Sequence, residues 1–548
     1  MKYKDTHRII SLYYNTIKHL QPKQLLNRVY RPWVLDCKVN FKNLKYKNFR
    51  SWNNYLEYKS SHVDGNVFEF LNTKLDYSKW NDNNESKLFN YNLHYFNELK
   101  SCDGEFRTSL YLNMIDSWIK NNEYRQGSGW EPYPLSLRIV NWIKWFQTNT
   151  PKDDWLYNLA NQCNSLSNQI EYHLRGNHLF ANGKALIFAG LFFEHPTASV
   201  WFQKGLNIVD KELKEQVLRD GGNFELSPMY HNIFLEDLLD LYQLALVTQS
   251  TVLLKRISAW AHIIKNMLVW AELMSHPDGE VSFFNDSAKC IAPIYVDLHN
   301  YATSLGIIHN PKEIEPDKIQ VNHLFESGFF SVSSLDYKCI LDVGDIGPSY
   351  IPGHGHADVF SFELSLHGKR LFVNRGTSEY GSGTIRELER STSSHNTVDI
   401  DGYSSSEIWG GFRVAKRATV SALTHKLEGN SVYISALHDG FSRLPGKNLH
   451  TREWLFSDNK ITITDKVTGD FNFSFGYIHI HPDFDIKLIG NNKCEIYFNN
   501  SIYCIAQFSS DISLEEGYWS PEFGLKIENN FIKYPIVEGN CKIYLELI

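Results

Sequence analysis

The stretch "HNPKEIEPDKIQVNH" (309–323) separates two parts of the chain with different hydrophobic periods, and this change decides the predicted fold. Before it, apolar residues recur at helical spacing. After it, short runs alternate between apolar and polar residues. The stretch itself contains two Pro and five charged residues, as is typical of a connection between folding units. Because 548 residues exceed the size of one hydrophobic core, at least two domains are expected.

The part before this stretch is predicted to be helical. "LSLRIVNWIKWF" (135–146) and "FLEDLLDLYQLALV" (234–247) both have the pattern of amphipathic helices. Polar connections such as "RQGSGWEPYP" (125–134) join one helical segment to the next without an intervening strand. We therefore predict an all-α domain of antiparallel helix pairs over 83–315, with 1–82 as a mixed, mainly helical segment packed on it.

The C-terminal part of the chain, 316–548, is predicted to be an antiparallel β-sandwich. Runs such as "KITITDKV" (460–467) and "KIYLELI" (542–548) are rich in β-branched and aromatic residues. Gly, Asn and Asp turns separate them, and no helical pattern lies between them. Many short strands without intervening helices favour a sandwich.

Composition narrows the possible partners and locations. The net charge is −7 without a basic stripe, so nucleic acid is not expected as a partner. Aromatic residues make up 14% of the chain, which suits stacking on sugar rings as well as core packing. We expect no membrane span and no secretory signal, hence a cytoplasmic location, or a periplasmic or secreted one if a leader has been removed. The eight cysteines lack CxxC spacing and are expected to be reduced, buried thiols.

Two stretches of the helical part carry candidate catalytic residues. "RGNHLFANGKAL" (175–186) places Asn177 and His178 just before a helical run. The alternative is an N-cap Asn beside a polar His. "DGGNFELSPMYHN" (220–232) places Tyr230 in the first turn of a helix that Pro228 begins. The alternative there is a core aromatic residue.

Substrate-binding candidates precede another helix. "GWEPYPLSLR" (129–138) mixes stacking, charged and hydrogen-bonding side chains, which suit a sugar, although a Pro-rich helix entry with a purely structural role has the same composition. The candidates are Trp130, Glu131, Tyr133 and Arg138.

The β part contributes two polar stretches. "YIPGHGHADVFSF" (350–362) puts His354, His356 and Asp358 at every second position, so an extended chain would present them on one face. A metal site, a pair of proton-transfer groups and a polar strand edge all fit this pattern. "IRELERSTSSHNTV" (385–398) brings Arg386 and Arg390, which suit an anionic ligand or a solvated edge.

In this order, these stretches resemble the heparinase II/III and alginate lyase group of polysaccharide lyases. The resemblance also rests on "FNYNLHYF" (89–96) and "SSEIWGGFRVAKRA" (405–418), and it covers most of the chain. It implies an incomplete α/α toroid followed by an antiparallel β-sandwich, with the active site between them. It also implies β-elimination at a 4-O-linked uronic acid in an acidic polysaccharide, and we expect a bacterial surface polysaccharide made by the same cell.

The resemblance assigns roles to individual residues. Asn177 and His178 would donate to the uronate carboxylate and stabilise the enolate. Tyr230 and His354 would be Brønsted base and acid. Because a free Tyr has a pKa of about 10, the base needs cationic neighbours, for which the sequence offers Arg138, Arg386 and Arg390. Tyr380 is expected to line the cleft.

A metal is a separate question. In some relatives of this group a zinc ion is held by the second His of "GHGH", an Asp and a later His, which map to His356, Asn374 and His395. This chain has Asn where the pattern has Asp, and a neutral amide is a poor zinc ligand. We expect these three residues to form a hydrogen-bonded cluster that fixes the loop of His354, and we expect no required cofactor.

Two other functions remain open from the sequence. A glycoside hydrolase on a helical toroid needs two placed carboxylates, for which Glu131, Glu225 and Asp220 are candidates. That hypothesis leaves the Asn, His and Tyr candidates without a role. A glycan-binding protein without catalysis is the third possibility, which the Asp-to-Asn change favours weakly.

Overall fold

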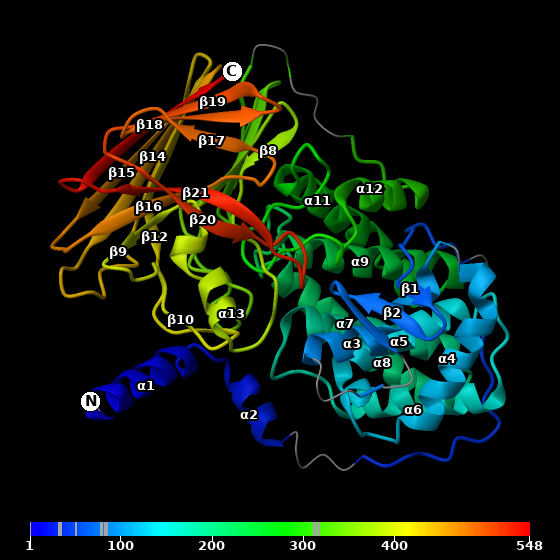
Figure 1. The fold of residues 1–548 in the computed structure, drawn as a ribbon. Coiled ribbons are helices and arrows are strands. Elements are labelled where there is room, and N and C mark those ends of the chain that lie inside the picture. Colours follow the sequence, from blue (N-terminus) through cyan, green and yellow to red (C-terminus); the bar gives the residue numbers. More distant parts are fainter. Residues whose placement is uncertain are drawn as a thin grey trace.

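The chain folds into a helical region followed by antiparallel sheets, which confirms the predicted fold class (Figure 1). The structure, a computed structural model, describes residues 2–30, 36–49, 52–76, 80–81, 86–102, 104–310, 315 and 318–548. The two predicted domain boundaries lie between 82 and 83 and between 315 and 316. Of these four residues, the structure describes only 315.

The helical region is built around one helix, α7, which contacts α5, α6, α8 and α9. Most α7 side chains are buried all round the helix, as expected for a helix enclosed by others. Gly190 allows α8 to approach closely, since a Cβ there would lie 2.7 Å from the Phe202 backbone. The helices are α3 (Lys87–Tyr95), α4 (Thr108–Asn121), α5 (Pro132–Trp145), α6 (Asp153–Asn168), α7 (Gly176–Phe192), α8 (Pro196–Gln216), α9 (Pro228–Thr248), α10 (Thr251–Leu254), α11 (Ile257–Met274) and α12 (Tyr295–Ser304).

The N-terminal segment is divided between the two regions. Three short strands, β1 (His62–Asp64), β2 (Val67–Phe70) and β3 (Thr73–Asp76), form a small sheet whose middle strand contacts α3. Helix α1 (Lys2–Ile17) instead contacts strand β11 (Arg413–Val414) of the β region, and α2 (Pro22–Tyr30) follows it. The expectation that this whole segment packs on the helical region is therefore wrong for α1, because Thr16 and Tyr13 contact Trp409 beside β11.

The β region contains three larger sheets. The first has the order β12-β13-β14-β15-β22-β19-β18-β17, the second β20-β21-β16-β9 and the third β4-β5-β6-β7-β8, all antiparallel. Along β13 and β15 every second residue is buried, the pattern that the sequence predicted. The strands of the third sheet are β4 (Gln320–Leu324), β5 (Phe329–Ser333), β6 (Tyr337–Asp342), β7 (Phe362–Leu366) and β8 (Lys369–Phe372). Those of the first two are β9 (Val398–Ile400), β12 (Val420–Glu428), β13 (Ser431–His438), β14 (Leu449–Ser457), β15 (Lys460–Thr468), β16 (Ser474–His479), β17 (Asp485–Leu488), β18 (Lys493–Phe498), β19 (Ser501–Phe508), β20 (Ser513–Trp519), β21 (Ile527–Pro535) and β22 (Asn540–Leu547).

The loops that leave the third sheet lie against the helical region. The β6–β7 loop carries the "GHGH" stretch, and the segment after β8 leads into the short helix α13 (Thr384–Glu389). Beside α13 lies the two-stranded ribbon of β10 (Ile408–Trp409) and β11 (Figure 1). The β6–β7 loop meets the α11–α12 connection through His354 and Asp286, and the segment after β8 meets the first turn of α9 through Tyr380 and Tyr230. Glu225, just before α9, binds the first turn of α7, so the fold brings the predicted catalytic stretches to one place.

Two other expectations can be compared with the structure. Cys163, Cys339, Cys494, Cys504 and Cys541 are buried free thiols, as predicted, but Cys37, Cys102 and Cys290 are exposed. Among the described residues, no helix is both long and apolar enough to cross a bilayer.

Candidate active site

Tyr230 lies at the start of α9, where the local sequence fixes its position. Pro228 begins the helix, and the Ser227 hydroxyl accepts a hydrogen bond from the Tyr230 backbone N–H at 3.2 Å. The Tyr230 ring centroid lies 3.9 Å from that of His354, and its hydroxyl is 2.8 Å from the Tyr380 hydroxyl. Residues from α9, the β6–β7 loop and the segment after β8 thus meet at one point, as the resemblance implied.

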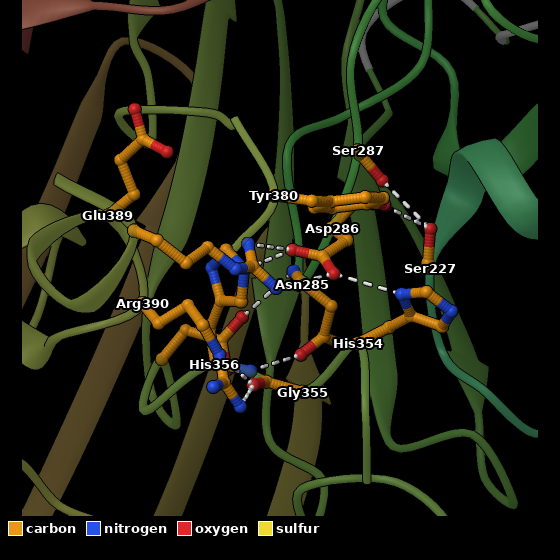
Figure 2. Close-up of polar contacts among 12 residues, drawn as sticks. Ser227, Asn285, Asp286, Ser287, His354, Gly355, His356, Tyr380, Glu389 and Arg390 are labelled. Atoms are coloured by element: carbon orange, nitrogen blue, oxygen red, sulfur yellow. Dashed lines mark hydrogen bonds and ion pairs between the residues drawn. The ribbon is translucent and has the colours of Figure 1, made fainter. Parts of the chain in front are cut away.

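A buried carboxylate, Asp286, organises the β side of the site (Figure 2). Its Oδ2 lies 2.9 Å from Nδ1 of His354, and its Oδ1 lies 2.8 Å from Nε2 of His356. Arg386 donates to both carboxylate oxygens. Although burial alone would raise the pKa of Asp286, Arg386 and the two histidines hold it well below its ordinary value. The ionised carboxylate accepts the Nδ1–H of His354, so Nε2 is the nitrogen left to exchange a proton.

Glu225 connects the start of α7 with His354. The residue before the helix, Arg175, has a φ of 64° and its side chain makes no capping bond. Instead, Glu225 Oε1 accepts the Asn177 backbone N–H at 2.8 Å, and its negative charge lies at the positive end of the helix dipole. Gly176 is needed here, because a Cβ would lie 2.3 Å from that oxygen. The other Glu225 oxygen is 3.4 Å from His354 Nε2.

His178 faces the site beside carboxylates that favour its protonated form. Its side chain is 27% exposed, and its ring stacks on Tyr133 with centroids 4.2 Å apart. Nδ1 lies 3.2 Å from a carboxylate oxygen of Glu171. Burial alone would lower the pKa of His178, but Glu171, helped by Glu225 and Glu131, raises it above its ordinary value. A protonated His beside Asn177 provides donors for a substrate carboxylate.

The expected activation of Tyr230 by arginines is wrong. Burial raises the pKa of Tyr230 well above its ordinary value, and Tyr380 and Asp286 raise it further. Arg138 lies in the helical core, stacked over Trp118 and bonded to Gln162. Tyr230 therefore carries its proton in the free protein.

The predicted arginine contacts to substrate are also wrong, since all three guanidinium groups are buried and have protein partners. Arg386 is paired with Asp286, and Arg390 donates to the carbonyl oxygens of Gly355 and Gly410. Both arginines hold loops of the site together instead of lining its surface.

The other substrate-binding candidates divide into two groups. Tyr133, Tyr380 and Glu131 are partly exposed beside His178 or Tyr230. Trp130 is buried, and its Nε1–H donates to the Asn122 carbonyl at 3.3 Å, so it packs in the core.

The carboxylates considered for a hydrolase are each bonded to other groups of the protein. Asp220 accepts the backbone N–H of Ser327 at 2.7 Å and holds the β4–β5 turn. Glu225 is committed to capping α7, and Glu131 bonds to Tyr91 and Lys87. Each carboxylate has a structural partner.

The residues at the possible zinc position do not match the three-ligand set. Nδ1 of His356 lies 3.1 Å from Nε2 of His395, so these two histidines contact each other as expected. Asn374 is bonded elsewhere: its amide donates to Ser361 at 3.4 Å and accepts the Asn396 backbone N–H at 3.3 Å. Within the described residues, no group of three or more His, Cys, Asp or Glu side chains is arranged to hold a metal ion.

Sequence reasoning missed Asp286 and Glu171 and assigned Glu225 only to a hydrolase. Asp286 lies in the α11–α12 connection, shortly after the stretch "VSFF" (281–284). It is far from His354 and His356 in the sequence, so no motif links the three residues. Glu171 precedes Asn177 by six residues. Its carboxylate reaches the His178 ring only because the chain turns before α7, and the sequence does not show that turn.

The fold and these contacts define a class of protein. Its members combine a helical region with antiparallel sheets and place an Asn, a His and a Tyr between them. Residues 19–309 match the description "Heparinase II/III N-terminus", and residues 317–542 match "Heparinase II/III-like, C-terminal". The chain therefore belongs to the heparinase II/III family.

Individual proteins resemble the chain more distantly. A heparin-sulfate lyase from Bacteroides stercoris is 25% identical over 443 residues, which are 74% of this chain and 60% of that protein, so the chain spans well under the full length of this relative. A crystal structure of heparinase III superposes with a TM-score of 0.70 at 16% identity, covering 96% of this chain and 85% of that one. A chondroitin AC lyase from Streptomyces coelicolor A3 gives 0.51 at 10% identity, covering 97% and 79%. The two structures establish the likeness of fold.

Proposed function

We propose that this protein cleaves a uronic-acid-containing acidic polysaccharide by β-elimination and leaves a 4,5-unsaturated uronate end. The observation that carries the proposal is the contact between Tyr230 and His354, with ring centroids 3.9 Å apart, beside the Asn177–His178 pair that Glu225 holds. A hydrolase would need two free carboxylates at the same place.

The reaction divides into charge stabilisation and proton transfer. The side chains of Asn177 and protonated His178 bind the uronate carboxylate and stabilise the negative charge that develops when C5 loses its proton. The C5–H bond breaks, and its electron pair is first delocalised onto the carboxylate as an enolate. That pair forms the C4=C5 double bond when the enolate collapses. In the step after the C5 proton has left, the C4–O4 bond breaks with its electron pair going to O4, and O4 receives a proton from the protein.

The two proton-transfer roles follow from the state of each group in the free protein. Tyr230 carries its proton because burial raises its pKa, so its hydroxyl is assigned as the donor to O4. His354 donates Nδ1–H to Asp286, so its Nε2 is assigned as the acceptor of the C5 proton. The Tyr380 hydroxyl, 2.8 Å from that of Tyr230, is placed to return a proton after each turnover.

Ultraviolet absorbance of unsaturated uronate ends, followed over a panel of uronate polysaccharides, tests the reaction. Elimination gives a rising signal, which Tyr230→Phe and His354→Ala are expected to slow strongly. New reducing ends without absorbance would indicate hydrolysis, and binding without cleavage would indicate a glycan-binding protein. Incubation in D₂O tests the roles: Tyr230→Phe is expected to retain exchange of the C5 hydrogen, and His354→Ala to lose it.

A further inference from the structure

The two N-terminal helices expose apolar side chains and bury polar ones. On α1, Ile10 and Tyr14 are 59% and 67% exposed, whereas Asn15 is 8% exposed. On α2, Val29 is 64% exposed, whereas Gln24 is buried. This is the reverse of a helix that covers a protein core.

Specific polar contacts fix this orientation. The Trp409 Nε1–H donates to the Thr16 hydroxyl at 3.1 Å on the inner side of α1. The Gln24 amide donates to the Tyr350 carbonyl at 3.3 Å on the inner side of α2. In Figure 1 both helices lie along one side of the molecule, so their other faces are turned away from it.

The exposed apolar residues are concentrated in this segment. Those of α1 recur at i, i+1, i+4, i+5 and i+8, which places them on a single stripe of the helix. Concentration within 22 residues distinguishes them from single apolar residues scattered over a surface. They are Ile9, Ile10, Tyr13, Tyr14, Ile17, Leu25, Leu26, Val29 and Tyr30.

The same segment is basic within an acidic chain. Residues 2–30 contain six Lys and Arg and one Asp, although the whole chain has a net charge of −7. Arg8, Lys18 and Arg28 are among the exposed residues of this segment. An exposed apolar stripe on a helix rich in Lys and Arg, with Tyr among the apolar side chains, is typical of a helix that lies in the interface of an anionic bilayer.

We propose that α1 and α2 dock on the surface of an anionic lipid bilayer, with their apolar faces entering the headgroup region. A two-fold contact with a second copy is disfavoured, because it would bring two copies of this basic segment together. Since Gln24 binds the backbone of Tyr350, four residues before His354, docking would hold the candidate active site near the bilayer. This proposal does not rest on the proposed function.

Sedimentation of the full chain with sucrose-loaded vesicles tests the docking. We expect binding to vesicles of phosphatidylcholine with phosphatidylglycerol, weaker binding at higher salt, and little binding to phosphatidylcholine alone. The double variant Ile10→Asp/Leu26→Asp is expected to bind at least about tenfold more weakly. The matched control Ile308→Asp changes a 64% exposed residue outside the segment and is expected to bind normally.

Three results would overturn the proposal. They are no sedimentation with either vesicle, equal sedimentation with both, and equal loss of binding in the control and the double variant. Sedimentation velocity without lipid can give a fourth result against the proposal. If the wild type is a dimer and the double variant is a monomer, the apolar face binds a second copy of the chain. Circular dichroism, expected to be unchanged because both substituted side chains are exposed, verifies that the double variant is folded.

Discussion

The carboxylate of Glu225 accepts the backbone N–H of Asn177 at 2.8 Å, and 48 residues separate the two in the sequence. The bond caps α7 from another loop, because Arg175 provides no capping side chain. The same carboxylate lies 3.4 Å from His354 Nε2, so one residue positions groups from both the helical region and the β region.

This relationship predicts different outcomes for two substitutions of Glu225. Glu225→Ala removes the acceptor and is expected to lower the free energy of unfolding by about 0.5–2 kcal/mol, the range for a lost helix cap. Glu225→Gln keeps an acceptor oxygen for Asn177 and is expected to retain most of that stability. Urea unfolding measures both. Equal destabilisation by the two variants would show that the cap is not what Glu225 contributes.

The Tyr230 and Tyr380 hydroxyls, 2.8 Å apart, predict unequal effects on turnover. Tyr230→Phe removes the proton donor and is expected to lower kcat by about 10²–10⁴-fold, the usual contribution of general acid–base catalysis. Tyr380→Phe removes only the partner hydroxyl, so its effect on kcat is expected to be smaller. Initial rates of absorbance increase provide the comparison, and a larger loss in Tyr380→Phe would reverse the assignment.

The buried pair of Asp286 and Arg386 predicts a large effect on stability. Both side chains are fully buried, so Asp286→Ala leaves an uncompensated guanidinium and is expected to cost about 3–5 kcal/mol. The double variant Asp286→Ala/Arg386→Met removes both charges and is expected to recover part of this loss. Chemical denaturation of both single variants and of the double variant measures the coupling energy between the two side chains. If the changes in the free energy of unfolding simply add, the two charges are not coupled and the prediction is wrong.

The Glu171–His178 contact predicts a pH effect on activity. Glu171 raises the pKa of His178, so Glu171→Gln is expected to lower it and to move the alkaline limb of kcat/KM to lower pH. Glu495→Gln, on β18, is the control. An unchanged limb in Glu171→Gln would mean that His178 does not titrate in this profile.

The same pKa shift has a consequence for stability. Because the pKa of His178 is higher in the folded protein than its unfolded value of 6.5, its contribution is fully present below that value. The contribution is lost as pH rises through the folded pKa. Urea unfolding at a series of pH values is expected to show this loss in the wild type and a smaller one in Glu171→Gln.

The fold class could be predicted because it depends on local periodicity. Helical spacing in 135–146 and 234–247 became α5 and α9, and alternation in 460–467 became β15. These patterns are present in the chain before any tertiary contact forms. The packing of α1 on β11 could not be predicted in this way, because polar contacts to Trp409 decide it.

The sequence by itself determined the two regions and the residue types of the site: an Asn–His pair, a Tyr at a helix start and the "GHGH" loop. Only the tertiary structure decided which charged groups act on them. Arg138 is directed into the core, Arg386 is neutralised by Asp286, and the pKa of Tyr230 is raised. The physical reason is that burial and charge pairing depend on contacts such as that of Asp286 with His354, across 68 residues of sequence.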